Sequence, residues 1–191
     1  MAKIGFLLLS GGRSSRMGTP KALIEINGST LLETTARAGA EFEERILSVN
    51  DPLIPTPEGF LRVGDVYAGC GPMGGIHAAL LATKCDALVT APCDTPYYSK
   101  VLAQYLSQQY EPDLDAIVLL DSTGRVHPLC GVYAKRCLPE LEAHLSTGRF
   151  KLMRMLEHVR LKTITLPPQF DDSVFENLNT PEELAVFSSK K

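Results

Sequence analysis

Short apolar segments alternate with helix-patterned segments along the chain, and this alternation constrains the fold more than any other feature. Strands are expected at residues 3–9, 45–49, 61–64, 87–91, 115–120, 129–134 (of undetermined direction) and 161–166. Helices are expected at residues 30–42, 73–82, 101–108, 138–145 and 151–157, with another starting at Thr180-Pro181. Such alternation favours a mostly parallel sheet covered on both faces. We predict an α/β fold, a three-layer α/β/α sandwich with a Rossmann-like sheet, as one domain over residues 1–191.

A loop rich in glycine and basic residues follows the first expected strand. Between Leu9 and Lys21 it holds Gly11, Gly12, Arg13, Arg16 and Gly18. The glycines let backbone N–H groups approach a ligand, and the cations suit a triphosphate. The loop matches neither the Walker A pattern nor Gly-x-Gly-x-x-Gly, which disfavours kinase-like and dinucleotide-dependent enzymes. The alternative, a solvated basic loop, would not need three glycines and three cations together.

Three further segments follow expected strands or precede a helix, where ligands of α/β proteins bind. Asp94 follows the strand at residues 87–91 and suits Mg²⁺, which binds through few carboxylates plus substrate phosphates. Asp65 can accept hydrogen bonds from a base or ribose, beside the glycine-rich residues 69–75. Asn177 and Asn179 can contact a phosphate or a second substrate. The alternatives are that Asp94 only forms a turn, that the glycine-rich residues 69–75 are a plain connection, and that the segment with Asn177 and Asn179 only caps a helix.

Composition excludes several classes of protein. A net charge of -3 provides no bulk attraction to nucleic acid or to an acidic membrane surface, so we expect neither as a partner. The longest apolar run near the N-terminus, residues 6–9, is too short for a signal peptide, and no membrane span appears elsewhere. Five cysteines without a Cys-x-x-Cys pair indicate neither zinc nor disulfides, and we expect a cytoplasmic protein in which all five are core or bystander residues. His77 is expected to be packed, while His127 is not assigned.

The motif at Leu9–Lys21 resembles the signature of the molybdenum cofactor nucleotidyltransferases, Gly-Gly-x-x-x-x-Arg-Met-Gly-x-x-Lys after an apolar strand. The resemblance extends over almost the whole chain through residues 71–75, 92–96, 127–128 and 177–184, in the family's order. It implies transfer of GMP from GTP to molybdopterin, releasing pyrophosphate, with Mg²⁺ as cofactor. The Gly11-Gly12 pair resembles the guanylyl branch. A cytidylyl branch and the sugar-phosphate nucleotidylyltransferases are the alternatives. Other cofactor-biosynthesis proteins and apo-molybdoenzymes are the implied protein partners.

The resemblance also implies roles for individual residues. The predicted nucleotide-binding residues are Leu9, Ser10, Gly11, Gly12, Gly18, Lys21, Ser48, Asn50, Asp65, Gly71 and Asp94. The predicted catalytic residues are Arg16, Lys21, Asp94, Asn177 and Asn179, with Asp94 also as the metal ligand.

The chain departs from the family pattern at a few positions. Ser10 stands where alanine is usual, and Pro20 where aspartate is frequent. Lys151 replaces a frequent arginine and loses its bidentate fork. Either Ser48 or Asn50 fills the base-contacting position, and the pattern leaves both open.

Overall fold

The central feature of the structure, a computed structural model that describes residues 2–11 and 20–178, is one large β-sheet. Its strands are β1 (Ile4–Leu9), β4 (Arg45–Ser48), β5 (Leu61–Val63), β6 (Ala87–Pro92), β7 (Ala116–Leu120), β8 (Val126–Ala134) and β9 (Leu161–Thr165). Their order across the sheet is β5-β4-β1-β6-β8-β7-β9. Every neighbouring pair is parallel except those of β8, which runs antiparallel to both β6 and β7.

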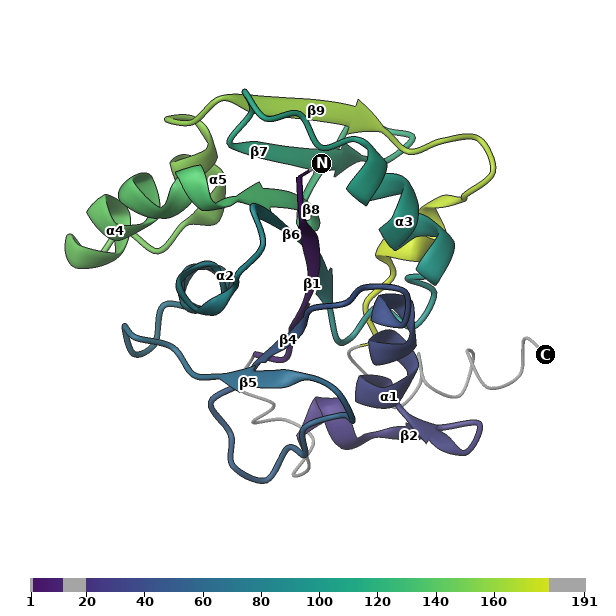
Figure 1. Cartoon of the computed structure of the whole chain (residues 1–191). Coiled ribbons are helices and arrows are strands. Elements are labelled where there is room, and N and C mark those ends of the chain that lie inside the picture. Colours follow the sequence, from purple (N-terminus) through teal and green to yellow (C-terminus); the bar gives the residue numbers. More distant parts are fainter. Residues whose placement is uncertain (1, 12–19, 179–191) are drawn as a thin grey trace.

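Helices cover both faces of this sheet (Figure 1). The α-helices are α1 (Leu31–Ala36), α2 (Pro72–Ala82), α3 (Lys100–Gln108), α4 (Leu138–Ser146) and α5 (Leu152–Leu156). The 3₁₀ turns are η1 (Lys21–Leu23), η2 (Arg37–Gly39), η3 (Lys135–Cys137) and η4 (Asp172–Phe175). A hairpin of β2 (Glu25–Ile26) and β3 (Ser29–Thr30) precedes α1. Because α1 and α3 lie on one face and α2, α4 and α5 on the other, the predicted three-layer α/β/α fold is confirmed.

Strand β1 shows why the sheet needs two helical layers. Phe6 and Leu8 belong to the apolar cluster on the α1 and α3 side, while Leu7 and Leu9 belong to the cluster on the α2 and α4 side. All four are buried. A strand buried on both faces is a continuous apolar run, the pattern from which the sequence predicted it.

Three local predictions need correction. The helix expected at residues 30–42 ends at Ala36 and continues as the turn η2 to Gly39, where a Cβ would lie 2.4 Å from a Phe6 ring carbon. The β2–β3 hairpin was missed although Asn27 and Gly28 both have positive φ, as an Asn-Gly hairpin turn requires. Strand β8 begins at Val126, earlier than expected, because it pairs with β7 around a hairpin.

Two further observations complete the architecture. In the described ranges, 2–11 and 20–178, no helix is long and apolar enough to cross a membrane. The helix start predicted at Thr180-Pro181 lies outside the described residues.

Candidate functional site

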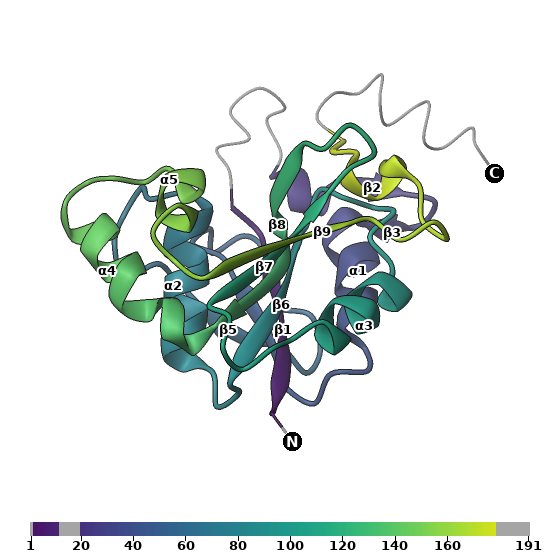
Figure 2. The same cartoon turned by 90° about the horizontal axis from the view of Figure 1, so that it is seen from above.

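The carboxyl ends of the parallel strands bring several predicted residues to one edge of the sheet (Figure 2). After β1, Ser10 donates its backbone N–H to the Ser48 carbonyl at the end of β4, at 2.9 Å. The Cys93 N–H, after β6, donates to the Leu9 carbonyl at 2.9 Å. These bonds extend the ladder past the strand ends, so the loops that follow the three strands start side by side.

An ion pair between Lys21 and Asp94 lies at this edge. Lys21 Nζ lies 2.6 Å from Asp94 Oδ2, although the residues are 73 positions apart in the sequence. Their side chains are 17% and 24% exposed, so a ligand can reach both. Pro20 precedes η1 with φ −54°, within the range a proline ring imposes, and its carbonyl accepts the Leu23 N–H. The proline that departs from the family pattern therefore starts the turn that carries Lys21.

The turn that carries Asp94 is held from several sides. Thr35 Oγ1, in α1, donates to the Cys93 carbonyl at 3.2 Å. Thr95 Oγ1 donates to the Pro92 carbonyl at 2.7 Å. The Leu178 N–H donates to the carbonyl of Asp94 itself at 3.1 Å. Because its backbone is bound on both sides, Asp94 presents its carboxylate from a fixed position.

Asp65 and Asn50 form a reciprocal pair after β5 and β4. The Asn50 side-chain amide donates to Asp65 Oδ2, and the Asp65 backbone N–H donates to Asn50 Oδ1, both at 2.8 Å. Ser48 differs from Asn50, because it is buried and a Cβ at Gly75 would lie 2.4 Å from its Oγ. The two candidates for the base-contacting position thus lie in different environments, one packed under α2 and one exposed.

The glycines around the start of α2 have different structural roles. Gly71 has φ +59° and ψ −149°, a conformation that side chains other than hydrogen disfavour, and it is exposed just before Pro72 starts the helix. Gly75 is buried and allows α2 to lie close to Ser48. Gly71 and the likewise exposed Gly69 are therefore glycines that a ligand can approach, whereas Gly75 is not.

The remaining predicted residues divide into two groups. Leu9 and Ser10 are buried and Gly11 exposed at the end of β1, while Asn177 is exposed one residue before Leu178. Four predicted residues lie outside the described residues: Gly12, Arg16, Gly18 and Asn179.

Sequence reasoning did not assign a group at the other side of this edge. His127 Nε2 lies 2.9 Å from Asp121 Oδ2, and the His127 ring stacks on Phe175 with centroids 3.8 Å apart and planes 9° apart. The His127-Pro128 motif was noticed, but neither Asp121 nor Phe175 carries a sequence signal that joins it to His127. Pairing of β7 with β8 brings Asp121 and His127 together.

Cysteine chemistry finds no support in the structure. All five cysteines are free and buried, consistent with the prediction. Burial raises the pKa of the Cys93 thiol to about 11, and a hydrogen bond with Ser10 lowers it only in part. Burial likewise raises the pKa of Cys130 to about 12. These thiols stay protonated near neutral pH and are poor nucleophiles.

The donor groups that could bind a metal ion are few. Among residues 2–11 and 20–178, no group of three or more His, Cys, Asp or Glu side chains could hold a metal ion. Asp94 presents a carboxylate beside the cationic Lys21. A single carboxylate fits a cation such as Mg²⁺ that completes its shell with water and substrate phosphates, and it does not fit a metal held by protein alone.

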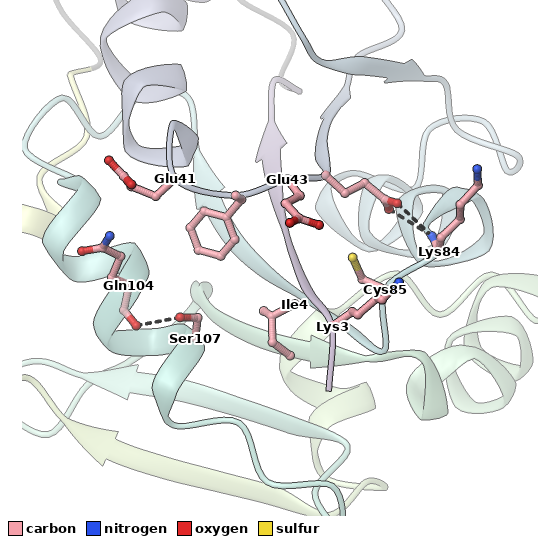
Figure 3. A pocket seen from close by; sticks show the side chains of 10 residues that line it. Lys3, Ile4, Glu41, Glu43, Lys84, Cys85, Gln104 and Ser107 are labelled. Atoms are coloured by element: carbon pink, nitrogen blue, oxygen red, sulfur yellow. Dashed lines mark hydrogen bonds between the residues drawn. The ribbon is translucent and has the colours of Figure 1, made fainter. Parts of the chain in front are cut away.

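One cavity lies elsewhere. It measures about 560 Å³ and is lined by residues near the amino ends of β1, β4 and β6, among them Lys3, Glu43 and Cys85, and by Gln104 of α3 (Figure 3). None of the predicted site residues lines it. Because the loops of α/β proteins that bind ligands follow the carboxyl ends of strands, we place the functional site at the Lys21–Asp94 edge.

Comparison with known proteins identifies the class. A parallel sheet with a cation and a carboxylate after β1 and β6 suits enzymes that act on nucleoside triphosphates, and residues 6–163 match the MobA-like NTP transferase domain. The chain belongs to this family of nucleotidyltransferases.

Two relatives have the same named activity. The chain is 33% identical to a probable molybdenum cofactor guanylyltransferase of Peptoclostridium acidaminophilum, over 95% of this chain and 87% of that one. It is also 33% identical to molybdenum cofactor guanylyltransferase of Vibrio parahaemolyticus, over 95% and 93%.

Solved structures agree with the fold. Molybdopterin-guanine dinucleotide biosynthesis protein A of Archaeoglobus fulgidus superposes with a TM-score of 0.80 at 25% identity, covering 96% of this chain and 95% of that one. The 2-C-methyl-D-erythritol 4-phosphate cytidylyltransferase of Thermus thermophilus, at 16% identity and a TM-score of 0.68, covers 99% and 98% and shares the fold.

Proposed function

We propose that the protein is a guanylyltransferase that transfers GMP from GTP to the terminal phosphate of molybdopterin. The products are molybdopterin guanine dinucleotide and pyrophosphate. The observation that carries this proposal is the Lys21–Asp94 pair, at the sheet edge where the loop after β1 meets the turn after β6. The relatives named molybdenum cofactor guanylyltransferase, similar over nearly the whole chain, supply the substrate pair.

The reaction needs positioning and charge stabilisation rather than a general base. An oxygen of the molybdopterin phosphate attacks the α-phosphorus of GTP, the new P–O bond forms, and the bond to the bridging oxygen of the leaving pyrophosphate breaks. The attacking oxygen is already anionic at neutral pH, so no proton must be removed from it. Lys21 and Arg16 neutralise the negative charge of the triphosphate.

Asp94 is the residue proposed to hold Mg²⁺. Bound there with the phosphates, the cation would supply positive charge to the phosphate oxygens. Lys21 Nζ lies 2.6 Å from the same carboxylate and balances its negative charge.

The nucleoside and the acceptor are assigned to different parts of the edge. Asp65 and Asn50 are proposed to contact the base or ribose, since their pair is exposed to an approaching ligand. Leu9, Ser10, Gly11, Gly12, Gly18 and Gly71 are proposed to bind the nucleotide through backbone groups. Asn177 and Asn179 are proposed to act on the acceptor phosphate. We further propose that the enzyme works in the cytoplasm, with cofactor-biosynthesis proteins and apo-molybdoenzymes as partners.

The deciding experiment measures pyrophosphate release. Purified protein is given GTP, CTP, ATP or UTP with Mg²⁺, with and without molybdopterin. We expect release with GTP and molybdopterin together, and loss of release when EDTA removes the metal. Release with CTP in place of GTP would assign the protein to cytidylyl transfer, and release with a sugar phosphate as acceptor would contradict both. Nucleotide binding without any release would indicate a regulator instead of an enzyme.

A further inference from the structure

Asp121 and His127 form a compact hydrogen-bonded unit at the turn between β7 and β8. Asp121 Oδ1 accepts the backbone N–H groups of Thr123 and Arg125, at 2.9 and 3.0 Å, and the Thr123 hydroxyl at 2.6 Å. Asp121 Oδ2 faces His127 Nε2 at 2.9 Å. These donors, led by the Thr123 side chain, hold the pKa of the Asp121 carboxyl well below its usual range. An ionised carboxylate can only accept, so Nε2 of His127 donates, and the imidazole ring has one defined orientation.

The oriented ring of His127 packs flat against the last residue of η4. The Phe175 ring, 9% exposed, lies parallel to it with centroids 3.8 Å apart. The other end of η4 is tied to the same hairpin turn, because the Ser122 N–H donates to Asp172 Oδ1 at 3.0 Å and the Ser122 hydroxyl bonds Asp172 Oδ2. The hairpin turn therefore fixes both ends of η4.

The chain after η4 crosses the carboxyl edge towards Asp94. Two residues after Phe175 comes Asn177, and the next residue, Leu178, donates its N–H to the Asp94 carbonyl. Leu178 is buried against Ile26 and Leu31 of the hairpin and α1. Asn177 thus lies between two anchors, the ring stack on one side and the Asp94 turn on the other.

The first anchor lies on the strand next to the one that leads to Asp94. Strand β8 pairs antiparallel with β6, with Thr90 opposite Gly131. The ring stack therefore belongs to the neighbour of β6 in the sheet, and β6 is the strand whose following turn carries Asp94.

We propose that Asp121 and His127 are positioning residues for the transfer reaction, acting through Phe175 to hold Asn177 beside Asp94. The inference rests on the proposed function, since Asn177 is there assigned to the acceptor phosphate. The hydrogen bond from His127 to Asp121 orients the imidazole ring. The ring positions Phe175 by stacking on it, and Phe175 in turn positions the backbone of Asn177. The GTP-binding groups lie on the loops after β1, β4, β5 and β6. This chain of contacts reaches them through the bond from the Leu178 N–H to the Asp94 carbonyl, one of several bonds that hold that turn.

The test separates transfer from GTP binding. For His127→Ala we expect kcat for pyrophosphate release with molybdopterin to fall roughly tenfold to thirtyfold, because small misplacement of a reacting group is costly. The Kd for GTP without acceptor should change less than about twofold, and His158→Ala, at an exposed histidine outside the site, should leave kcat unchanged. A variant with unchanged kcat, or with GTP affinity and kcat reduced by the same factor, would overturn the inference.

Two further variants of His127 separate the contribution of the stacked ring from that of the hydrogen bond to Asp121. His127→Phe keeps a flat ring to stack on Phe175 but loses the hydrogen bond to Asp121, and we expect a kcat between that of the parent and that of His127→Ala. His127→Gln keeps a donor for Asp121 without a ring and should resemble His127→Ala. The reverse ranking would overturn the proposed route through the stack. Phe175→Leu tests the same stack from η4, so the proposal stays testable if the His127 variants do not fold.

A double-mutant cycle with Asn177→Ala tests whether His127 acts through Asn177. If it does, His127→Ala should lower kcat by less than about twofold when Asn177 is already alanine. Equal losses in both backgrounds would show that His127 acts elsewhere. The proposed function fails separately, namely if the unaltered protein releases no pyrophosphate from GTP with molybdopterin.

Discussion

The two halves of the sheet contribute different kinds of structure to the same edge. In the parallel half, β5-β4-β1-β6, the loops after the strands carry Lys21, Asn50, Asp65 and Asp94, and glycines let backbone approach closely. In the other half, antiparallel β8 pairs with β6 and β7, and a side-chain cluster around Asp121, His127 and Phe175 holds a later segment in place.

The difference shows how a transferase fold can separate binding from alignment. Loops at the ends of parallel strands whose backbone N–H groups are accessible suit a nucleotide, because its phosphates need many N–H donors. Among residues 2–11 and 20–178, the mixed half contributes no comparable loop. Its cluster of Asp121, His127 and Phe175 instead holds the segment after η4 across the edge. We therefore expect changes in the parallel half to alter GTP binding, charge or packing there, and changes in the mixed half to alter transfer and acid stability.

The largest effect is expected for Asp94→Ala in the parallel half. Loss of the carboxylate should lower kcat by about a thousandfold or more, because charge stabilisation at a reacting phosphate is the dominant contribution proposed here. The melting temperature should change little, since the turn is held by its backbone. Pyrophosphate release at several Mg²⁺ concentrations measures the effect, with Asp113→Ala, an exposed residue elsewhere, as control. Near-normal activity of Asp94→Ala in Mg²⁺ would contradict the metal assignment.

A packing change in the same half ranks second. For Gly75→Ala, the new Cβ would meet Ser48 Oγ at 2.4 Å, so we expect a loss of about 1–3 kcal/mol in the free energy of unfolding. Urea unfolding monitored by circular dichroism measures it. Adding Ser48→Ala to Gly75→Ala removes the hydroxyl and should recover part of the loss. No recovery would mean that Ser48 is not the limiting contact.

Base contact is expected to depend on Asn50 and not on Ser48. Asn50→Ala removes the amide that pairs with Asp65 and should weaken GTP binding about tenfold, the usual cost of one hydrogen bond of this kind. Ser48→Ala, at a buried position, should change the Kd for GTP less than about twofold. Calorimetric titration without molybdopterin compares the two. The opposite ranking would assign the base contact to Ser48.

The smallest effect concerns acid stability in the mixed half. Hydrogen bonds hold the pKa of Asp121 below its unfolded value of about 4, so the carboxylate stabilises the fold above that pH, and the contribution is lost as pH falls through the folded pKa. Asp121→Asn should therefore melt lower than the parent at pH 7, and the difference should narrow below about pH 4. Melting curves from about pH 7 to pH 2 measure it. A difference that stays constant with pH would contradict this linkage.

The parallel half is also where the sequence placed most of the candidate site residues. Strands β1 and β6 are buried runs, and Asp94 stands next to one of them, so a local pattern was enough to propose a site there. The pattern did not separate Ser48 from Asn50, because burial under Gly75 depends on how α2 packs on β4.

In the mixed half the sequence predicted β7 and β9 to within one residue, but the cluster of Asp121, His127 and Phe175 escaped prediction because its contacts are distant in the sequence. His127 and Phe175 meet only after β8 pairs with β7 and the segment after β9 folds back, and neither residue has a motif that names the other. The short β2–β3 hairpin is a different case, because the sequence does contain a local signal for it. Asn27-Gly28 is a typical hairpin turn, and the expected elements did not include it.

The bond from Leu178 to the Asp94 carbonyl bears on how the enzyme is made in the cell. A chain emerging from the ribosome presents β1, Lys21 and β6 well before Leu178. The ion pair of Lys21 and Asp94 can form in that interval, but the turn lacks its last backbone donor. If domains fold from the N-terminus as they are synthesised, the nucleotide side is assembled first and the acceptor side is completed later, once Leu178 has been synthesised.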